Sequence, residues 1–154
     1  VQAELRPDQE TIFLPTPSLR SFDADVFRAA TEPYPDLVPN GFDHKAWLAD
    51  RKNVMYEEDG SIGLCTYEYP GMYNVHWYFK VRGRAVLKLA RRMLDDLFTN
   101  HDVQIVRGLT RTDLKGARWA ARQIGMTSQG IMDYPDGDYE LFTMTKDEFY
   151  RKDK

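Results

Sequence analysis

The stretch from Tyr73 to Phe98 reads Y-N-V-H-W-Y-F-K-V-R-G-R-A-V-L-K-L-A-R-R-M-L-D-D-L-F, and the spacing of its apolar residues changes halfway along. Residues 73–79 are mostly aromatic or β-branched and contain no breaker, which predicts a largely buried strand. From Ala85 onward the apolar residues recur at helical spacing, which predicts a long amphipathic helix. Residues 80–84, K-V-R-G-R, connect the two and hold the stretch's one glycine.

A basic glycine turn between a strand and a helix has the chemistry of a phosphate site. The first N–H groups of a helix have no intrahelical partner, and the helix dipole favours an anion beside them. Arg82 and Arg84 add cations next to Gly83. An ordinary strand-to-helix connection that needs one glycine fits the same pattern, so both interpretations stay open.

Composition indicates one globular domain spanning residues 1–154. The chain is 42% hydrophobic and 29% charged, it has no apolar run long enough for a membrane span, and its first residues show no signal-peptide pattern. Cys65 is the single cysteine, so no intramolecular disulfide is possible and a cytoplasmic location is expected. The histidines His44, His76 and His101 lack metal-ligand spacing, so no zinc site is expected.

Charge is unevenly distributed along the chain. The formal net charge is −3, yet residues 80–122 hold 11 basic and four acidic residues, a local net charge of +7. A local basic zone on an acidic protein suits a small polyphosphate ligand better than extended nucleic acid, which favours a broad basic face. The alternative is a pair of solvated helix faces.

The remaining pattern predicts a mixed α/β chain with an antiparallel meander followed by a β-α-β unit. Strands are expected at residues 11–14, 53–57, 61–69, 103–109, 127–134 and 138–145. Helices are expected at residues 19–31, 43–51 and 113–124, with a loop at 32–41 and a capping box from Thr145 to Glu148. Together with the opening stretch, this gives a mostly antiparallel sheet of about six or seven strands with about four helices.

Three local patterns together resemble the GNAT superfamily of acyl-CoA-dependent N-acyltransferases. The turn from Lys80 to Ala85 is similar to the family's pyrophosphate loop, [Q/R]-x-x-G-x-[G/A], with Lys80 at the Gln/Arg position. The predicted helix that ends in Ile124-Gly125-Met126 is similar to the family's helix ending in Gly-Phe. The closing hairpin, with its strand Y-E-L-F-T-M at residues 139–144, looks like the family's last two strands.

The resemblance implies acetyl-CoA, or another acyl-CoA, as cofactor. Its pyrophosphate would bind the turn, its pantetheine arm would lie where the strand ending at Phe79 and the strand from Val103 separate, and its thioester carbonyl would meet a backbone N–H near Tyr78 or Phe79. Trp119 lies on the second helix, either beside the cofactor or in the core. The cofactor-binding residues implied in this way are Tyr78, Phe79, Lys80, Val81, Arg82, Gly83, Arg84, Ala85, Leu114 and Trp119.

Two positions depart from the family pattern. Counting back from Gly125 places Leu114 where the family has Asn, and Ala121 where many members have the Tyr that protonates the leaving thiolate. A general acid contributes about 10²–10⁴ in rate. Its loss weakens the case for fast acetyl transfer without abolishing it, and Tyr134 is a reserve candidate for the acid.

Acylation of an amine also requires a group that accepts a proton. His76, in the predicted central strand, is the candidate general base, acting through water, because the pKa of histidine lies near neutrality. Strand alternation places it on one face with Asn74 and Tyr78. Glu68 and Tyr69 on the neighbouring strand are reserve candidates, and a half-buried, hydrogen-bonded structural histidine is the alternative role for His76.

The resemblance therefore implies an N-acyltransferase that acts on a primary amine of a small molecule, a protein lysine or a protein N-terminus. Monomer and homodimer both remain open. The ending D-Y-E-L-F-T-M-T-K also looks like GNAT-like proteins of tailed phages, so the alternative is a catalytically idle phage protein with an internal-virion or head-assembly role, in the host cytoplasm or the virion. A nucleic-acid-binding module would rest on the local charge alone.

Overall fold

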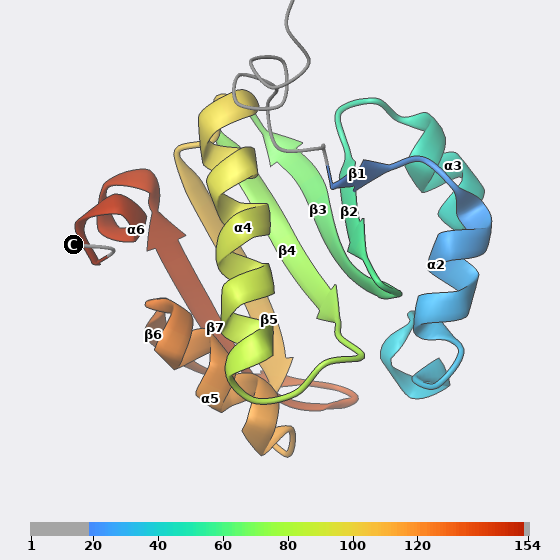
Figure 1. The fold of residues 1–154 in the computed structure, drawn as a ribbon. Coiled ribbons are helices and arrows are strands. Elements are labelled where there is room, and N and C mark those ends of the chain that lie inside the picture. Colours follow the sequence, from blue (N-terminus) through green and yellow to red (C-terminus); the bar gives the residue numbers. More distant parts are fainter. Residues whose placement is uncertain (1–18, 153–154) are drawn as a thin grey trace, which may run out of the picture.

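The computed structural model describes residues 19–152 (Figure 1). Its strands are β1 (Arg20–Ser21), β2 (Val54–Glu58), β3 (Ser61–Tyr69), β4 (Met72–Tyr78), β5 (Ile105–Arg111), β6 (Thr127–Tyr134) and β7 (Gly137–Thr145). Its helices are α2 (Ala24–Thr31), the 3₁₀ helix η1 (Pro35–Leu37), α3 (His44–Ala49), α4 (Arg84–Asn100), α5 (Lys115–Ile124) and α6 (Lys146–Lys152). The strand predicted at residues 11–14 lies outside the described residues.

The seven strands form one sheet in the order β1-β2-β3-β4-β5-β7-β6. β4 and β5 are parallel and are joined through α4, whereas all other neighbouring strands are antiparallel. This confirms the predicted mixed, mostly antiparallel sheet with a central β-α-β unit. Because β7 pairs with both β5 and β6, β6 forms one edge of the sheet.

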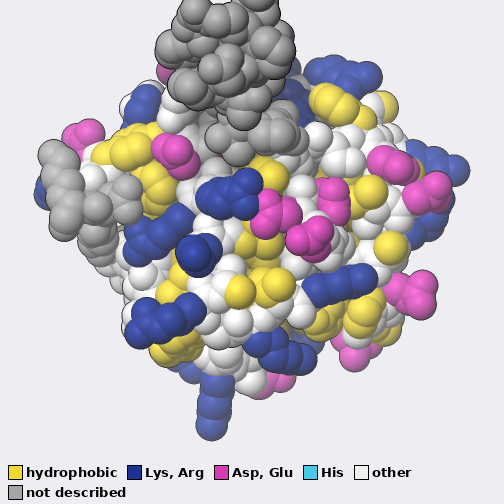
Figure 2. Space-filling model, viewed as in Figure 1, with side chains coloured by type: hydrophobic (Ala, Val, Ile, Leu, Met, Phe, Trp, Pro, Cys, Tyr) yellow, Lys and Arg dark blue, Asp and Glu magenta, His cyan; other side chains and the backbone are white. Residues whose placement is uncertain are grey.

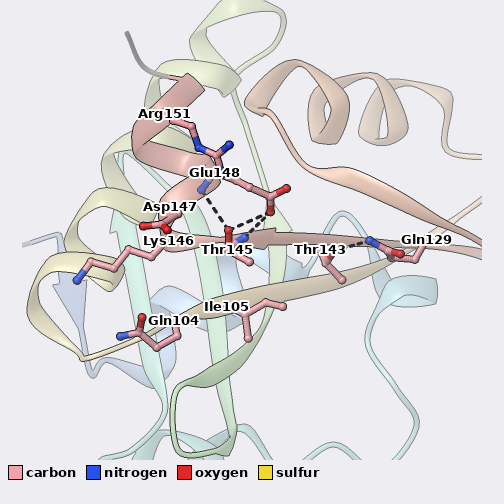
Figure 3. Close-up of a pocket in the computed structure, with 9 residues that line it drawn as sticks. All are labelled: Gln104, Ile105, Gln129, Thr143, Thr145, Lys146, Asp147, Glu148 and Arg151. Carbon is pink, nitrogen blue, oxygen red and sulfur yellow. Dashed lines mark hydrogen bonds between the residues drawn. The ribbon is translucent and has the colours of Figure 1, made fainter.

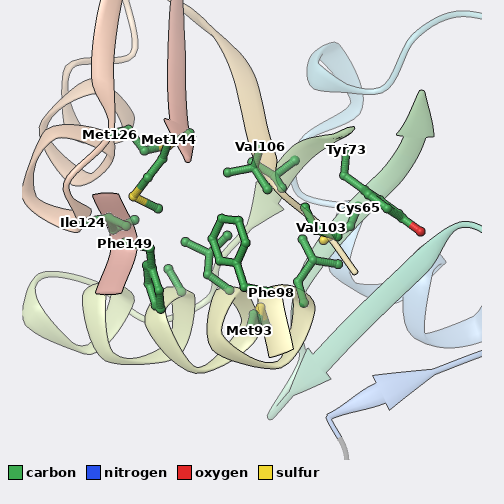
Figure 4. Packing of buried hydrophobic residues seen from close by; sticks show 14 of the residues in the cluster. Cys65, Tyr73, Met93, Phe98, Val103, Val106, Ile124, Met126, Met144 and Phe149 are labelled. Atoms are coloured by element: carbon green, nitrogen blue, oxygen red, sulfur yellow. The ribbon is translucent and has the colours of Figure 1, made fainter. Parts of the chain in front are cut away.

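Helices cover the two faces of the sheet unequally. On one face α4, α5 and α6 close the main core, which includes Phe98, Val106 and Met144 (Figure 4). On the other face α2 and α3 cover only the part made by β2, β3 and β4, where Phe27 and Trp47 pack with their strand partners. On that second face, side chains of β5, β7 and β6 remain accessible.

Two local expectations need correction at the start of the described chain. The helix predicted from residue 19 begins at Ala24, because the Asp23 side chain accepts a hydrogen bond from the Asp25 N–H and caps it. Arg20 and Ser21 instead form β1, opposite Tyr56 and Met55 of β2. The predicted loop at residues 32–41 contains η1.

Other predicted signals are confirmed at residue level. The Asp59-Gly60 turn joins β2 to β3 with positive φ at both residues, 52° and 87°. Gly125 ends α5 in the left-handed conformation. The capping box is present, since the Thr145 N–H donates to Glu148 Oε1 (2.9 Å) and the Glu148 N–H donates to Thr145 Oγ1 (3.1 Å). None of the helices described in residues 19–152 is long and apolar enough to cross a membrane.

A buried carboxylate fastens α5 to the sheet. Glu140 on β7 is 3% exposed and accepts hydrogen bonds from Arg118 Nε (2.8 Å) and Arg122 (2.5 Å), one turn apart on α5. Burial alone would raise the pKa of Glu140, but hydrogen bonds from Ser128, Arg118 and Arg122 outweigh it and hold the pKa below its ordinary value.

We expect Glu140→Gln to lower the free energy of unfolding by about 1–3 kcal/mol at pH 7, because charge-assisted hydrogen bonds are lost. The folded pKa is depressed, so the carboxylate stabilises the fold above its ordinary pKa of about 4.3, and this stabilisation is lost as pH falls through the lower folded value. Urea denaturation at pH 7 and pH 3 measures both effects. The control Glu58→Gln, which breaks a more exposed pair with Arg92, should cost less than about 1 kcal/mol. An equal loss in both variants, or one independent of pH, would contradict this account.

Candidate functional site

The parallel strands β4 and β5 pair over a short distance and then separate. Their register covers only Met72–Ile105, Tyr73–Val106 and Asn74–Arg107, although β4 continues to Tyr78 and β5 to Arg111. We call the two unpaired strand ends, residues 75–78 and 108–111, the wedge. The separation predicted from the sequence is therefore confirmed.

The apex of the wedge requires a small residue. A β-carbon on Gly108 would lie 3.2 Å from the Val75 carbonyl oxygen, so glycine lets the two backbones approach where pairing ends. Beyond this point the backbone edges of β4 and β5 that face one another make no ladder with each other. Such an edge offers N–H and C=O groups to an extended ligand.

The basic turn leads from the wedge into α4. Gly83 is the residue before the first turn of α4, with φ 62° and ψ −135°, and no side chain caps the helix. Arg82, Gly83, Arg84 and Ala85 are all exposed, and a β-carbon on Gly83 would meet nothing within 4 Å. The α4 N-terminus thus has no side-chain acceptor and opens to solvent, as an anion site requires.

The charges of α4 run against its own dipole. Its first turn holds no acid and its last turn no base, while Arg84 and Lys88 lie near the positive end. A cation in the first turn, such as Arg84, is unfavourable by about 0.3–1 kcal/mol. Figure 2 shows Lys and Arg side chains spread over the face formed by α4 and α5. An anion at this helix end would relieve that repulsion.

Hydrogen bonds hold the approach to the turn in place. The Lys80 N–H donates to Ser61 Oγ (2.8 Å), and the Tyr34 hydroxyl donates to the Phe79 carbonyl (3.1 Å). Burial raises the pKa of Tyr78 to about 12, so its hydroxyl stays protonated and donates to the Leu37 carbonyl (2.9 Å). The loop around η1 is thereby attached to the end of β4.

Lys80 contributes its backbone to the turn but directs its charge elsewhere. A β-carbon on Gly60 would lie 2.9 Å from Lys80 Nζ, so the ammonium group rests on the β2–β3 turn. Val81 is partly buried against the main core. Arg82 and Arg84 are therefore the cations closest in sequence to the open N–H groups of α4.

His76 lies on β4, on the face that carries α2 and α3. Its ring stacks on Tyr78 with centroids 5.6 Å apart, and neighbouring protein partly desolvates the ring although the side chain is exposed. That environment lowers the pKa of His76 by desolvation, so the neutral imidazole dominates at pH 7. A neutral, solvent-accessible imidazole has the state that a general base needs.

A polar cluster lies next to His76 on the same face; it joins Asn74 and the reserve candidate Glu68 to Arg107, which the sequence pattern did not single out. Arg107 Nε on β5 donates to the Asn74 side-chain oxygen (2.6 Å), and its guanidinium lies 3.7 Å from the Glu68 carboxylate. The cluster spans β3, β4 and β5 just below the wedge. Arg107, the one charged residue in the strand predicted at residues 103–109, was the available signal.

The other predicted site residues lie in separate places. Tyr134 ends β6 and packs edge-on against Tyr139 with centroids 5.4 Å apart; β5 and β7 separate it from His76 on β4. Leu114 precedes α5 without a side-chain cap, and Trp119 is exposed on α5. Ala121 is buried in the main core, so this position supplies no titratable group.

A further hollow of about 640 Å³ lies away from the wedge (Figure 3). It is bordered by Ile105 and Thr145, at the opposite end of β5 from the wedge, and by Lys146, Glu148 and Arg151 of α6. Its lining mixes charges of both signs, and it contains none of the predicted site residues.

No protein-family model matches the chain, and no curated protein matches it. Several solved structures match the chain. Spermidine N-acetyltransferase SpeG from Vibrio cholerae (F149A mutant) matches with a TM-score of 0.65 and 9% identity over 84% of this chain and 95% of that one. RimJ from Mycobacterium smegmatis, in complex with CoA-disulfide, matches with a TM-score of 0.63 and 15% identity over 80% and 78%.

A third match is the aminoglycoside acetyltransferase AAC(6')-Ib in complex with coenzyme A, with a TM-score of 0.58 and 17% identity over 70% of this chain and 74% of that one. An acetyltransferase of the GNAT family from Bacillus anthracis matches with a TM-score of 0.60 and 16% identity over 84% and 94%. The chain therefore has the GNAT fold, as its sequence pattern predicted. At these identities the likeness concerns the fold alone.

The conformation of Gly83 leads to a matched pair of predictions. We expect Gly83→Ala to lower the free energy of unfolding by about 1–3 kcal/mol, since its backbone angles are nearly confined to glycine. Gly116→Ala, in the first turn of α5 and equally free of contacts, should instead raise it by about 0.4–1 kcal/mol. Thermal and urea unfolding of both variants measure these effects, and a change of the same sign in both would refute the assigned Gly83 geometry.

Proposed function

We propose that this chain is an N-acyltransferase that transfers an acetyl or other acyl group from acyl-CoA to a primary amine. One observation carries the proposal: the wedge between β4 and β5 opens at the basic, uncapped N-terminus of α4. An extended arm and a pyrophosphate are the parts of coenzyme A that such a pair of features accommodates. Several solved structures with the same fold contain coenzyme A or acetyl-CoA, which supports the same ligand here.

The residues present fit the cofactor. Backbone N–H groups around residues 81–85 would bind the pyrophosphate, with Arg82 and Arg84 adding charge, and Gly83 leaves room for close approach. The free strand edges of the wedge would hold the pantetheine arm, and a backbone N–H near Tyr78 or Phe79 would stabilise developing negative charge on the thioester oxygen. We retain Lys80, Val81, Ala85, Leu114 and Trp119 as proposed contacts.

On the acceptor side, His76 is proposed to take the proton of the amine through water. Its neutral state follows from the lowered pKa, and an ordinary lysine amine, with a pKa of about 10.4, must lose a proton before it attacks. The exposed part of the same sheet face, around Leu109 and Tyr134, offers room for an acceptor. Two of the structurally similar proteins are named as a spermidine N-acetyltransferase and an aminoglycoside acetyltransferase. These names support an amine acceptor. A protein lysine or N-terminus belongs to the same chemistry.

A second candidate function is a catalytically idle protein of this fold, such as an assembly or internal-virion protein of a tailed phage. The favouring observation is Ala121, which is buried in the core where many enzymes of the family carry the tyrosine acid. Under this alternative the basic turn is inherited, with or without ligand binding, and turnover is absent. Ligand binding and turnover therefore have to be measured separately.

The first test is calorimetric titration of the protein with CoA and acetyl-CoA at low and moderate salt. We expect micromolar binding that weakens with salt, because exposed cations contribute to it. Gly83→Val should abolish binding while the circular dichroism spectrum is retained, since the turn can no longer present its N–H groups. The matched control is Gly41→Val, another glycine with positive φ and open surroundings, in the loop before α3; its affinity should equal that of the wild type. Absence of binding to the wild type would reject the cofactor assignment and favour the idle protein.

Turnover measurements test the proposed role of His76 as general base. With acetyl-CoA and a panel of primary amines, release of free CoA should fall by about 10²–10⁴ in His76→Ala while CoA affinity is unchanged. In the wild type, the limb of the pH–rate profile due to this base should lie below the ordinary histidine pKa of about 6.5, because the folded pKa is lowered. His101→Ala, at the far end of α4, is the control and should keep the wild-type rate. An unaltered rate in His76→Ala removes this residue from the mechanism.

A further inference from the structure

The strand β6 is an edge strand, and past the bulge between Ser128 and Gly130 its residues 131–134 have little of the usual protection against pairing. Its sequence T-S-Q-G-I-M-D-Y contains no Lys, Arg or Pro and one charge, and all eight residues are exposed. Apolar side chains are exposed on both faces, Ile131 at 53% on one and Met132 at 39% on the other. Natural proteins usually block such edges with charges, prolines or a covering element, because an open edge is a template for another strand.

The direction in which the backbone N–H and C=O groups of β6 point follows from the hydrogen bonds between β7 and β5. The Thr112 N–H donates to the Asp138 carbonyl, and the Lys146 N–H to the Gln104 carbonyl, so even-numbered residues of β7 point their backbone groups toward β5. In an antiparallel ladder the direction alternates. Asp133 and Ile131, which lie opposite Asp138 and Glu140, therefore point their N–H and C=O groups away from β7, into solvent.

We infer that a second copy of this chain pairs with β6, antiparallel and across a two-fold axis at Met132. In this register Ile131 of each copy faces Asp133 of the other, so the outward N–H and C=O groups of both residues find partners. Met132 faces Met132 of the second copy in a non-hydrogen-bonded pair. A two-fold contact of one strand with itself satisfies both copies equally.

Side chains select this register over its neighbours. Centring the axis on Asp133 would place two carboxylates directly opposite one another, which is unfavourable. Centring it on Ile131 would bring the bulge between Ser128 and Gly130 into the ladder. The register at Met132 separates the carboxylates and confines the ladder to residues 130–134, so that the unpaired Gln129 stays outside it. Gly130, with φ 111°, lies at the end of this ladder beside Tyr134 of the other copy, where an aromatic ring covers a glycine in a strand.

The pairing would add a residue of the second copy to the open sheet face. Leu109, Leu141 and Gly130 form a cross-strand row on the face that carries His76, and Gly130 leaves this row without a side chain at its outer end. Tyr134 of the second copy would continue the row. The inference does not depend on acyl transfer, since it rests on the strand edge alone.

Sedimentation of the full chain over a range of concentrations tests the pairing. We expect a dimer for the wild type, and monomers for Met132→Lys and Met132→Glu studied alone, because like charges would face one another on the axis. An equimolar mixture of these two variants should form a heterodimer, since position 132 faces itself only in this register. Tyr69→Lys, on another exposed aromatic residue, is the control and should remain dimeric.

Cross-linking gives a second, independent measurement. Met132→Cys should form an intermolecular disulfide under mild oxidation, because Cα atoms in a non-hydrogen-bonded pair are about 4.5 Å apart, within disulfide range. The native Cys65 is buried and should not compete. A monomeric wild type at all concentrations, a dimer that survives in both charged variants, or failure of the mixture to associate would each overturn the proposal. A wild type that stays monomeric yet binds an extended peptide along β6 would assign the edge to a different partner.

Discussion

The structure depends on the way in which β4 and β5 are each held by a different neighbour. β4 is paired with β3 from Met72 to Tyr78, and β5 with β7 along its whole length from Ile105 to Arg111. Only three register positions join β4 to β5 directly. Beyond them each strand follows its own antiparallel partner, so the separation needs no special residue except the glycine at its apex, Gly108.

The long helix α4 links this separation to the proposed anion site. A parallel pair of strands requires a crossover connection, usually a helix, and α4 provides it with Leu94, Leu97 and Phe98 fully buried. Burial of that face is enough to stabilise the helix even though its first turn carries Arg84 and no side-chain cap. Packing therefore compensates for a helix end that is electrostatically unfavourable by itself, and leaves the N-terminus free for a ligand.

Local signals in the sequence predicted most of the fold. Asp59-Gly60, Gly125 and the Thr145–Glu148 box each act within a few residues, and each was placed correctly. β1 was missed because two residues become a strand only by pairing with Tyr56 and Met55, which are remote in sequence. The Asp23 cap was a readable signal for the start of α2, but the apolar spacing from Leu19 masked it.

The candidate site also has one part that the sequence could predict and one part that it could not. The glycine turn was predictable because strand, turn and helix are contiguous. The Asn74–Arg107–Glu68 cluster was not, because it needs three strands to be brought together. The separation of His76 from Tyr134 follows from β7 lying between β5 and β6, an order that sequence adjacency does not reveal. Two strands, β5 and β7, therefore lie between Tyr134 and β4.

The free-energy cost of having Ala121 in place of a tyrosine acid can be estimated. A thiol has an ordinary pKa of about 8.5, so release of an unprotonated thiolate at pH 7 is uphill by about 2 kcal/mol relative to the thiol. This is smaller than the stabilisation of about 2.7–4 kcal/mol that one oxyanion donor commonly supplies. For the proposed transfer, the missing tyrosine leaves the thiolate unprotonated, while a backbone N–H at the end of β4 would still stabilise the thioester oxygen. The alanine by itself thus argues for a slower reaction and not for the absence of one.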